Sequence, residues 1–428
     1  MHNMKPVRRP TLIDLFAGCG GLSLGLEYAG FRPVFVNELH PDAMQTYLQN
    51  RPDGELQKPI NHVNDILDLT QKPGALEALA KRLKNEHGEI DIVAGGPPCQ
   101  GYSGIGHRRT FTDLKKLDIP SNHLYREMAT VVRAVAPKLF LFENVRGLLQ
   151  SRWTPAGDAG EIWETVQKTF ADIEVVIGRA THRYRLFHSL VHAREYGVPQ
   201  NRPRILLVGI RDDIGFIPEL DKRASGALPE PTNHAPDLVD LLGDLVDPNW
   251  LPGGSTASYV NPASNKFQRA LRTSISGTVA RIGDPITEQD YNAHSQRVIE
   301  KFEYMLAHNG KIKAADQTKK FAQRLLPERW GPLGPTITAT SLADDYVHFS
   351  QPRVLTVREW ARLQTFPDWY QFHGKRTTGG RRRAGDPSAG VWLRDLPRYT
   401  QIGNAVPVLM AHAVGQHLKR LLGYSDKL

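Results

Sequence analysis

The amino-acid sequence predicts an α/β protein with a doubly wound, mostly parallel sheet and a smaller second domain of irregular and β structure. Short apolar runs alternate with helical patterns through the first half of the chain. Turns rich in glycine or proline follow several of these runs, where parallel strands would end. From about residue 212 to 351 the chain is rich in Pro, Gly, Ser, Thr and Asn, with weak periodicity.

The apolar runs place strands in the order that a doubly wound sheet requires. We expect strands at residues 11–16, 33–36, 62–66, 90–94, 139–142, 183–191 and 205–210. The last two of these runs, residues 183–191 and 205–210, predict further strands after the first five.

Helical patterns separate the predicted strands. Helical spacing relates two sets of apolar residues, Leu22, Leu26 and Ala29, and Leu124, Met128, Val131 and Val135. Pro41 suits the first turn of a helix after the second strand. A helix over residues 354–363 has Thr356 as its N-cap, and an apolar helix over residues 406–422 closes the chain.

Composition limits the class of protein. With 428 residues the chain is long enough for two domains, and its net charge of +9 favours a polyanionic partner. Cys19 and Cys99 are too few for a disulfide framework and fit a reducing compartment. No run of about 18 apolar residues and no secretory signal are evident, so we expect a soluble, cytoplasmic protein.

A glycine-rich turn, DLFAGCGGLS at residues 14–23, lies between the first strand and the first helix. Its glycines permit close backbone approach, and the helix N-terminus offers free N–H groups. Glu38 ends the second strand, where a carboxylate can accept hydrogen bonds from ribose hydroxyls. Asp65 follows the third strand and could hold an exocyclic amine. These features indicate a pocket for an adenosine-containing cofactor, against the alternative of a structural turn with a solvated glutamate.

The details of the turn favour S-adenosylmethionine over NAD. The dinucleotide fingerprint G-x-G-x-x-G needs glycine at position 23, where this chain has Ser23. Phe16 also brings a bulky ring to a point where a ligand could stack. S-adenosylmethionine has no pyrophosphate and does not need the missing glycine.

Chemically reactive residues follow other predicted strands. Cys99 lies at the tip of the strand in DIVAGGPPCQGYS and is a candidate nucleophile, although most isolated cysteines are small buried hydrophobes. Glu143 ends another strand in FENV. The blocks QNRPR at residues 200–204 and GNAVP at residues 403–407 complete the set.

In their shared order, these blocks resemble the DNA (cytosine-5) methyltransferase family of the prokaryotic restriction–modification type. The resemblance covers residues 11–211 and 353–415 and includes D-x-F-x-G-x-G, G-P-P-C-Q-G, E-N-V, Q-x-R-x-R, R-x-L-T-x-R-E-x-A-R-L-Q-x-F-P and G-N-A-V-P. It implies that Cys99 is the nucleophile, that Glu143 is the acid, and that Arg204 holds the base with support from Arg202 and Gln200. It implies a cofactor pocket lined by Phe16, Gly18, Gly20, Glu38, Asp65, Ile66, Pro97, Asn404 and Val406.

The chemistry of cytosine agrees with these roles. A thiolate added at carbon 6 breaks the aromaticity and makes carbon 5 able to attack a methyl sulfonium, and an acid at nitrogen 3 stabilises the developing charge. Nothing in this reaction requires a metal, and no Cys/His cluster has ligand spacing. A base inside a duplex must first rotate out, at a cost of a few kcal/mol.

The DNA contacts are expected from two loops and a region without shared motifs. Gln100, Tyr102 and Ser103 belong to a loop that could close over the base, or that is merely flexible. Together with Gln200, they are the residues that we expect to contact DNA. The basic clusters at residues 107–109 and 381–383 could bind phosphates or remain solvated. By the resemblance, residues 212–352 read base edges in the major groove. We therefore divide the chain into a catalytic and cofactor-binding domain, residues 1–211 with 397–428, and a target-recognition domain and hinge, residues 212–396.

Three other functions would explain part of this pattern. A tRNA cytosine-5 methyltransferase would share the chemistry, but the length of residues 212–352 and the lack of a Cys-Phe-Thr signature near Glu143 favour double-stranded DNA. A DNA-binding protein without catalysis would have damaged blocks, and a nicotinamide oxidoreductase would not need Cys99. We expect a monomeric prokaryotic enzyme that associates with the nucleoid through DNA, with a cognate restriction endonuclease as a functional partner.

Overall fold

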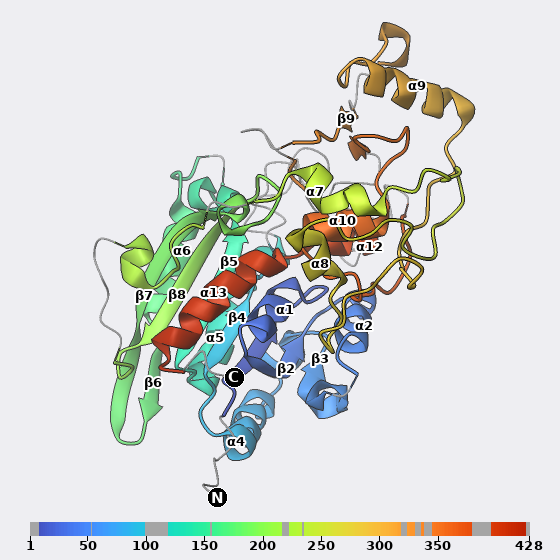
Figure 1. Cartoon of the computed structure of the whole chain (residues 1–428). Helices are drawn as coiled ribbons and strands as arrows, with labels where there is room; N and C mark the ends of the chain where they lie inside the picture. The colour runs from blue at the N-terminus through green and yellow to red at the C-terminus, as the bar shows by residue number, and fades with distance from the viewer. Residues whose placement is uncertain are drawn as a thin grey trace, which may run out of the picture.

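A computed structural model of the chain describes residues 8–52, 54–98, 119–154, 156–215, 222–232, 235–317, 323–329, 335–337, 345–378 and 395–424. Within these residues, an eight-stranded sheet forms the centre of the molecule (Figure 1). From one edge to the other, its strands are β3 (His62–Val63), β2 (Arg32–Asn37), β1 (Thr11–Leu15), β4 (Ile92–Gly95), β5 (Leu139–Val145), β8 (Pro203–Arg211), β7 (Ala180–His192) and β6 (Glu174–Ile177).

The direction of the strands confirms the predicted doubly wound, mostly parallel sheet. Strands β3, β2, β1, β4 and β5 are parallel neighbours, whereas β8 runs antiparallel to both β5 and β7. In this register Val145, at the end of β5, pairs with Arg204, at the start of β8. The reversed strand therefore begins at the edge where the parallel strands end.

All seven predicted strands are present, with β3 shorter and β7 longer than expected. Strand β6 was not predicted. It has four residues at the edge of the sheet, and Val176 within it is 68% exposed, so it carries little apolar signal.

Helices cover both faces of the sheet and continue beyond its upper end. They are α1 (Gly21–Tyr28), α2 (Pro41–Gln49), α3 (Leu67–Thr70), α4 (Ala75–His87), α5 (Tyr125–Val135), α6 (Glu161–Ala171), α7 (Leu238–Leu242), α8 (Lys266–Arg272), α9 (Gln296–Ala307), α10 (Val357–Leu363), α12 (Arg398–Asn404) and α13 (Val408–Leu421). Thr356 caps α10 as predicted, since its side chain accepts a hydrogen bond from the backbone N–H of Glu359.

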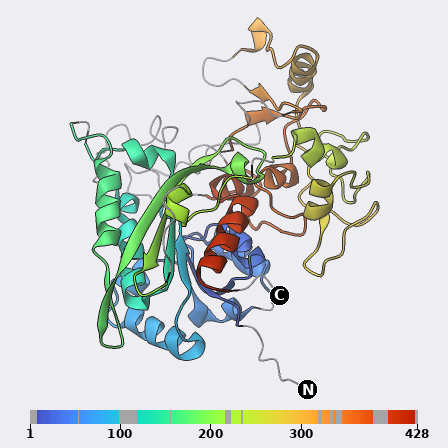
Figure 2. The same ribbon diagram turned by 60° about the vertical axis from the view of Figure 1, so that its left-hand side comes forward.

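Alternate residues of the central strands enter two different cores, as the period of a strand requires. Ile13 and Val93 pack with α4, α5 and α6. Leu12 and Ile92 pack with α1 and α13 on the other face. Figure 2 shows α13 (red) along one side of the sheet and the blue-green helices along the other.

Helices α1 and α13 approach closely because each carries a glycine that packs against an alanine in or next to the other helix. A Cβ added to Gly25 would lie 2.4 Å from the Cβ of Ala411, and one added to Gly415 would lie 2.9 Å from the Cβ of Ala29. This approach joins the two ends of the chain and carries the segment before α13 to the start of α1.

Residues 212–351 contain more helix than predicted. Helices α7, α8 and α9 lie in this region, and its regular strands in the described part are β9 (Arg324–Leu325) and β10 (Tyr346–Val347). The helices α7 and α8 are too short to form without tertiary packing, which sequence periodicity does not report. The description of this region as irregular holds, whereas its β content is small.

A third core crosses the predicted domain boundary. It contains Leu24 of α1, Leu238 and Phe302 from residues 212–351, Trp360 of α10 and Ile402 of α12. Helices α10 and α12 thus pack between residues 212–351 and the sheet (Figure 1). Among the described helices, none has the length and apolar character needed to cross a bilayer.

Candidate active site

The glycine-rich turn after β1 has three residues with positive φ. They are Phe16 at 55°, Gly18 at 56° and Gly20 at 84°. A Cβ added to Gly18 would meet nothing within 4 Å, so the turn is open there. A Cβ added to Gly20 would lie 2.8 Å from the Tyr370 hydroxyl, so Gly20 is packed from behind. Phe16 is the only non-glycine of the three, and positive φ is strained for such a bulky residue.

Two side chains at the end of β2 hold this turn. Asn37 Oδ1 accepts a hydrogen bond from the Phe16 N–H at 3.3 Å. Glu38 accepts from the N–H of Gly18 at 2.8 Å and from that of His40 at 2.7 Å. Burial raises the pKa of Glu38, and these two hydrogen bonds oppose the rise. Each carboxylate oxygen retains capacity for a further donor.

Asp65 and Ile66 follow β3 and adjoin the same edge of the sheet. Asp65 Oδ1 accepts a hydrogen bond from the Leu67 N–H at 3.0 Å, and Ile66 is 3% exposed. Leu39, which belongs to none of the sequence motifs, directly follows Glu38 and is 54% exposed.

The segment before α13 brings Asn404 and Val406 to the glycine-rich turn. Val406 is 8% exposed and Asn404 is exposed. A Cβ added to Gly21 would lie 2.3 Å from the carbonyl oxygen of Val406. A residue without a side chain is therefore needed at position 21 for this contact.

Glu143 and Arg204 form an ion pair at the ends of neighbouring strands. Arg204 Nε lies 2.7 Å from Glu143 Oε1, and their side chains are 13% and 11% exposed. A Cβ added to Gly96 would lie 2.9 Å from Glu143 Oε2. The carbonyl of Pro97 accepts a hydrogen bond from Asn144 Nδ2 at 3.1 Å. The segment that leads into Cys99 therefore runs directly beside the ion pair.

Several predicted site residues lie outside the described residues. They are Cys99, Gln100, Tyr102 and Ser103, together with the basic clusters at residues 107–109 and 381–383. Pro97 is described and buried, two residues before Cys99.

Gln200 and Arg202 do not reach the Glu143–Arg204 pair. Both are buried, and their side chains bind protein groups. Gln200 Nε2 donates to the Leu363 carbonyl at 2.8 Å and to Gln364 Oε1 at 2.7 Å. Arg202 Nη2 donates to the carbonyl of Gly403 at 2.9 Å. Within the Q-x-R-x-R block, Arg204 pairs with Glu143, whereas the side chains of Gln200 and Arg202 are buried in the protein interior.

Two further residues of the glycine-rich turn are buried. Cys19 is 1% exposed, its Sγ lies 3.3 Å from the Gln401 carbonyl, and burial raises the pKa of its thiol. These contacts suit a small filler better than a nucleophile. Asp14 is fully buried, and burial raises the pKa of its carboxyl to about 8. Asp14 is therefore mostly protonated at neutral pH.

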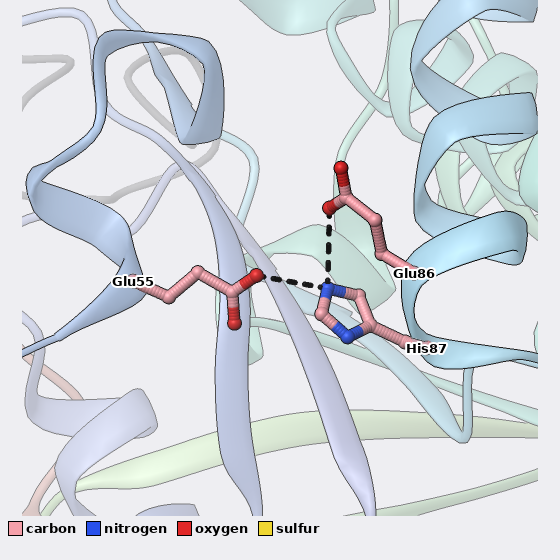
Figure 3. A group of neighbouring side chains, drawn as sticks. All are labelled: Glu55, Glu86 and His87. Carbon is pink, nitrogen blue, oxygen red and sulfur yellow. Dashed lines mark ion pairs between the residues drawn. The ribbon is translucent and has the colours of Figure 1, made fainter.

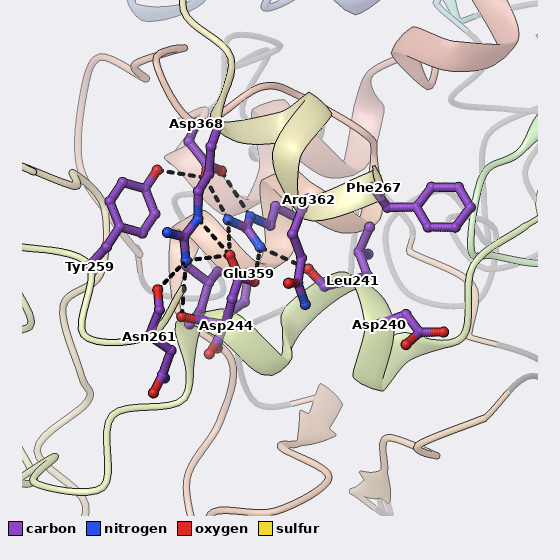
Figure 4. A network of polar contacts seen from close by, with 12 residues as sticks. Asp240, Leu241, Asp244, Tyr259, Asn261, Phe267, Glu359, Arg362 and Asp368 are labelled. Carbon is purple, nitrogen blue, oxygen red and sulfur yellow. Dashed lines mark hydrogen bonds and ion pairs between the residues drawn. The ribbon is translucent and has the colours of Figure 1, made fainter. Parts of the chain in front are cut away.

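A buried ionic network fastens α10 to the segment of residues 244–272 (Figure 4). Arg362 contacts Asp244 Oδ1 and Asp368 Oδ2, each at 2.5 Å. Asp244 also binds Arg272 at 2.6 Å, and the Tyr259 hydroxyl donates to Asp368 at 2.7 Å. Burial of so many charges is tolerated because each has an opposite partner. Arg362 of α10 is therefore structural.

Two groups of three potential metal ligands occur among the residues that the structure describes, Glu55, Glu86 and His87, and His182, Asp212 and Asp213. In the first group His87 Nε2 lies 3.1 Å from Glu55 Oε1 (Figure 3). Arg32 lies 2.6 Å from Glu55, and Arg82 lies 3.0 Å from Glu86. Because both carboxylates have an arginine partner, we assign no metal to this group.

Comparisons with known proteins agree with this geometry. A model of the family described as C-5 cytosine-specific DNA methylase matches residues 11–420. The chain is 30% identical over 425 residues to the Type II methyltransferase M.DdeI of Desulfomicrobium norvegicum, covering 95% of this chain and 88% of that protein. It is 31% identical over 428 residues to the Type II methyltransferase M.XorII of Xanthomonas oryzae pv. oryzae, covering 97% and 85%. A crystal structure of a DNA modification methyltransferase encoded within an E. coli prophage has a TM-score of 0.66 at 24% identity, over 97% of this chain and 99% of that one, and shares the fold.

Proposed function

The chain belongs to the C-5 cytosine-specific DNA methylase family, as its sequence blocks predicted, and we propose how its residues methylate carbon 5 of a specific cytosine in double-stranded DNA. The observation that carries the proposal is the Glu143–Arg204 ion pair, buried at the edge from which the Cys99 segment emerges. A carboxyl group and a guanidinium side by side match the ring nitrogen 3 and the carbonyl oxygen of cytosine.

In this proposal Cys99 adds its thiolate to carbon 6 of the extruded base. Glu143 holds nitrogen 3 and Arg204 holds the carbonyl oxygen, so that both stabilise the charge that the addition creates. Carbon 5 then becomes nucleophilic and accepts the methyl group. Loss of the carbon 5 proton restores the double bond to carbon 6 and expels the Cys99 thiolate. Arg204 also favours the thiolate of a cysteine brought near it.

The turn after β1 would hold S-adenosylmethionine, which supplies an electrophilic methyl group. The open space beside Gly18 and the spare acceptor capacity of Glu38 fit the backbone and ribose of such a ligand. Asp65 would accept from the exocyclic amine, and the exposed side chain of Leu39 would add an apolar wall. The other residues proposed for this pocket are Phe16, Gly20, Ile66, Pro97, Asn404 and Val406.

DNA would bind between the sheet domain and the recognition region. Gln100, Tyr102 and Ser103 would contact the duplex around the flipped base, and residues 212–352 would select the sequence. Because Gln200 and Arg202 are buried, we assign both to holding the protein around Arg204 and not to direct contact with the base. We keep the division into a catalytic domain, residues 1–211 with 397–428, and a recognition domain with hinge, residues 212–396.

The relatives named Type II methyltransferases support a place in a restriction–modification system. In that setting the enzyme would act as a monomer on DNA in the cytoplasm, at the nucleoid. A cognate restriction endonuclease would be its functional partner, sharing the recognition sequence.

Bisulfite sequencing tests the proposed substrate. The protein is expressed in cells without cytosine methylation, and genomic DNA and tRNA are sequenced after bisulfite treatment. We expect methylated cytosines at one short DNA sequence, and none with Glu143→Gln. Methylation confined to tRNA, or equal methylation by the variant, would overturn the proposal.

A further inference from the structure

We propose that Thr336 is a positioning residue through which the recognition region sets the orientation of Arg204. The inference rests on the proposed function, because it assigns Arg204 to the substrate base. It comes from a three-residue segment of the recognition region, residues 335–337, that lies against the Q-x-R-x-R block.

Hydrogen bonds join residues 335–337 to residues 200–202 one by one. The Thr336 hydroxyl donates to the Asn201 carbonyl at 2.7 Å, and the Asn201 N–H donates to the Pro335 carbonyl at 2.8 Å. The Ile337 N–H donates to Gln200 Oε1 at 3.3 Å. Both polar groups of the Asn201 backbone are thus held by the recognition region.

Arg202 completes the same contact. Its Nη1 donates to the Ile337 carbonyl, while its Nη2 donates to the carbonyls of Gly403 and Ala405 at 2.9 Å. Arg202 therefore ties the recognition segment to the loop that carries Asn404 and Val406. The Q-x-R-x-R block thereby contacts the recognition region, the loop proposed to bind the cofactor and, through Arg204, the acid Glu143.

Little freedom lies between Asn201 and the ion pair. Pro203 fixes the backbone between them and opens β8, where it pairs with His192. Arg204 follows at once and pairs with Val145 across the sheet. Because Pro203 restricts the backbone here, a shift of the Asn201 backbone would also move the Arg204 guanidinium. A displacement of about 1 Å is enough to lower the catalytic rate.

Thr336 is also held from the recognition side. Its N–H donates to the Tyr346 hydroxyl at 3.2 Å. Tyr346 is 2% exposed in β10, and the guanidinium of the exposed Arg324 lies 4.5 Å from the centre of its ring. Thr336 thus bridges a contact on the exposed side of the recognition region and the catalytic strand.

The test is Thr336→Val, which keeps the shape of the side chain and removes its hydroxyl. Radioactive methyl transfer to plasmid DNA should show kcat reduced about 10-fold, with the Kd values for DNA and cofactor unchanged. Thr336→Ser keeps the hydroxyl and should restore kcat. Tyr346→Phe removes the bond on the other side and should reduce kcat in the same way. Thr181→Val, at an exposed position of β7 outside the recognition region and the proposed site, is the matched control and should match the wild type.

Two outcomes would overturn this inference without contradicting the proposed function. One is an active wild-type enzyme with an equally active Thr336→Val variant. Another is a loss of kcat that Thr336→Ser does not restore and that follows an equal fall in thermal stability, since this indicates a merely structural role. An inactive wild-type enzyme would instead contradict the proposed function itself.

Discussion

Arg204 Nε lies 2.7 Å from Glu143 Oε1 because β8 runs antiparallel to β5. A parallel β8 would begin at the opposite edge of the sheet, with Arg204 the length of a strand away from Glu143. One reversed strand therefore creates the pair to which we assign recognition of the base.

Replacing Arg204 tests its role in catalysis. Arg204→Ala should reduce kcat/KM about 10²- to 10³-fold, since one preorganised donor to the developing charge is lost. Arg204→Lys should remain impaired, because an ammonium cannot reproduce the planar guanidinium. Steady-state methyl transfer measures both. Arg183→Ala, which removes an exposed ion pair with Glu174, is the control and should be fully active. Wild-type rates in Arg204→Ala would remove this residue from the mechanism.

Gly21 should tolerate no side chain. Gly21→Ala would bring a Cβ within 2.3 Å of the Val406 carbonyl and push the loop before α13 away from the turn. We expect a loss of stability of about 1–3 kcal/mol and weaker cofactor binding. Denaturant unfolding and calorimetric titration measure these. In Gly243→Ala the nearest atom is 3.8 Å away, so this control should leave cofactor binding unchanged. Equal behaviour of the two variants would argue against the close contact.

Breaking the network around Arg362 should be costly. Arg362→Met leaves Asp244 and Asp368 buried with one fewer cation, which we expect to destabilise the fold by about 3–5 kcal/mol. Thermal unfolding measures the effect. Arg297→Ala, which removes the mostly exposed arginine of an ion pair with Asp316, should unfold like the wild type. A stable Arg362→Met protein would show that these charges do not hold the recognition region.

Asp14 should make stability depend on pH. Its pKa is raised from 3.8 to about 8, so the folded protein keeps a proton that the unfolded chain releases. The stabilisation is complete below about pH 4 and falls as the pH rises towards about 8, by about 1.4 kcal/mol per pH unit. The asparagine in Asp14→Asn is neutral at every pH, so the stability of this variant should not decline in this way. Thermal unfolding between about pH 5 and 9 should show the variant gaining on the wild type as the pH rises. Parallel curves would contradict the raised pKa.

The sequence predicted the sheet well because alternating strands and helices leave a strong local signal. It also indicated the turn at Gly18 and Gly20 and the acid Glu38 from their spacing alone. It could not show that β8 is reversed, since hydrophobic patterns do not report strand direction. The meeting of Glu143 and Arg204 was therefore implied by the family resemblance and not by periodicity.

Burial of polar residues was the least predictable feature. Arg358, Glu359 and Arg362 are completely buried in α10, although charged residues at helical spacing usually mark a solvated face. Gln200 was expected to contact DNA and instead binds backbone and side-chain groups of the protein. Arg362 and Gln200 bind partners more than 100 residues away, Asp244 and the Leu363 carbonyl, which no local pattern contains. Glu359 pairs instead with the nearby Arg353, whose burial the sequence does not report.

The central claim is that Cys99 bonds transiently to an extruded cytosine. The direct measurement incubates the enzyme and S-adenosylmethionine with duplexes that carry 5-fluorocytosine at the methylated site. Fluorine cannot leave as a proton does, so we expect a covalent protein–DNA complex that survives denaturing electrophoresis, with the bond mapped to Cys99 by mass spectrometry. Cys99→Ser should bind the duplex and form no such complex. Methylation of ordinary DNA without any adduct on the fluorinated duplex would contradict the account.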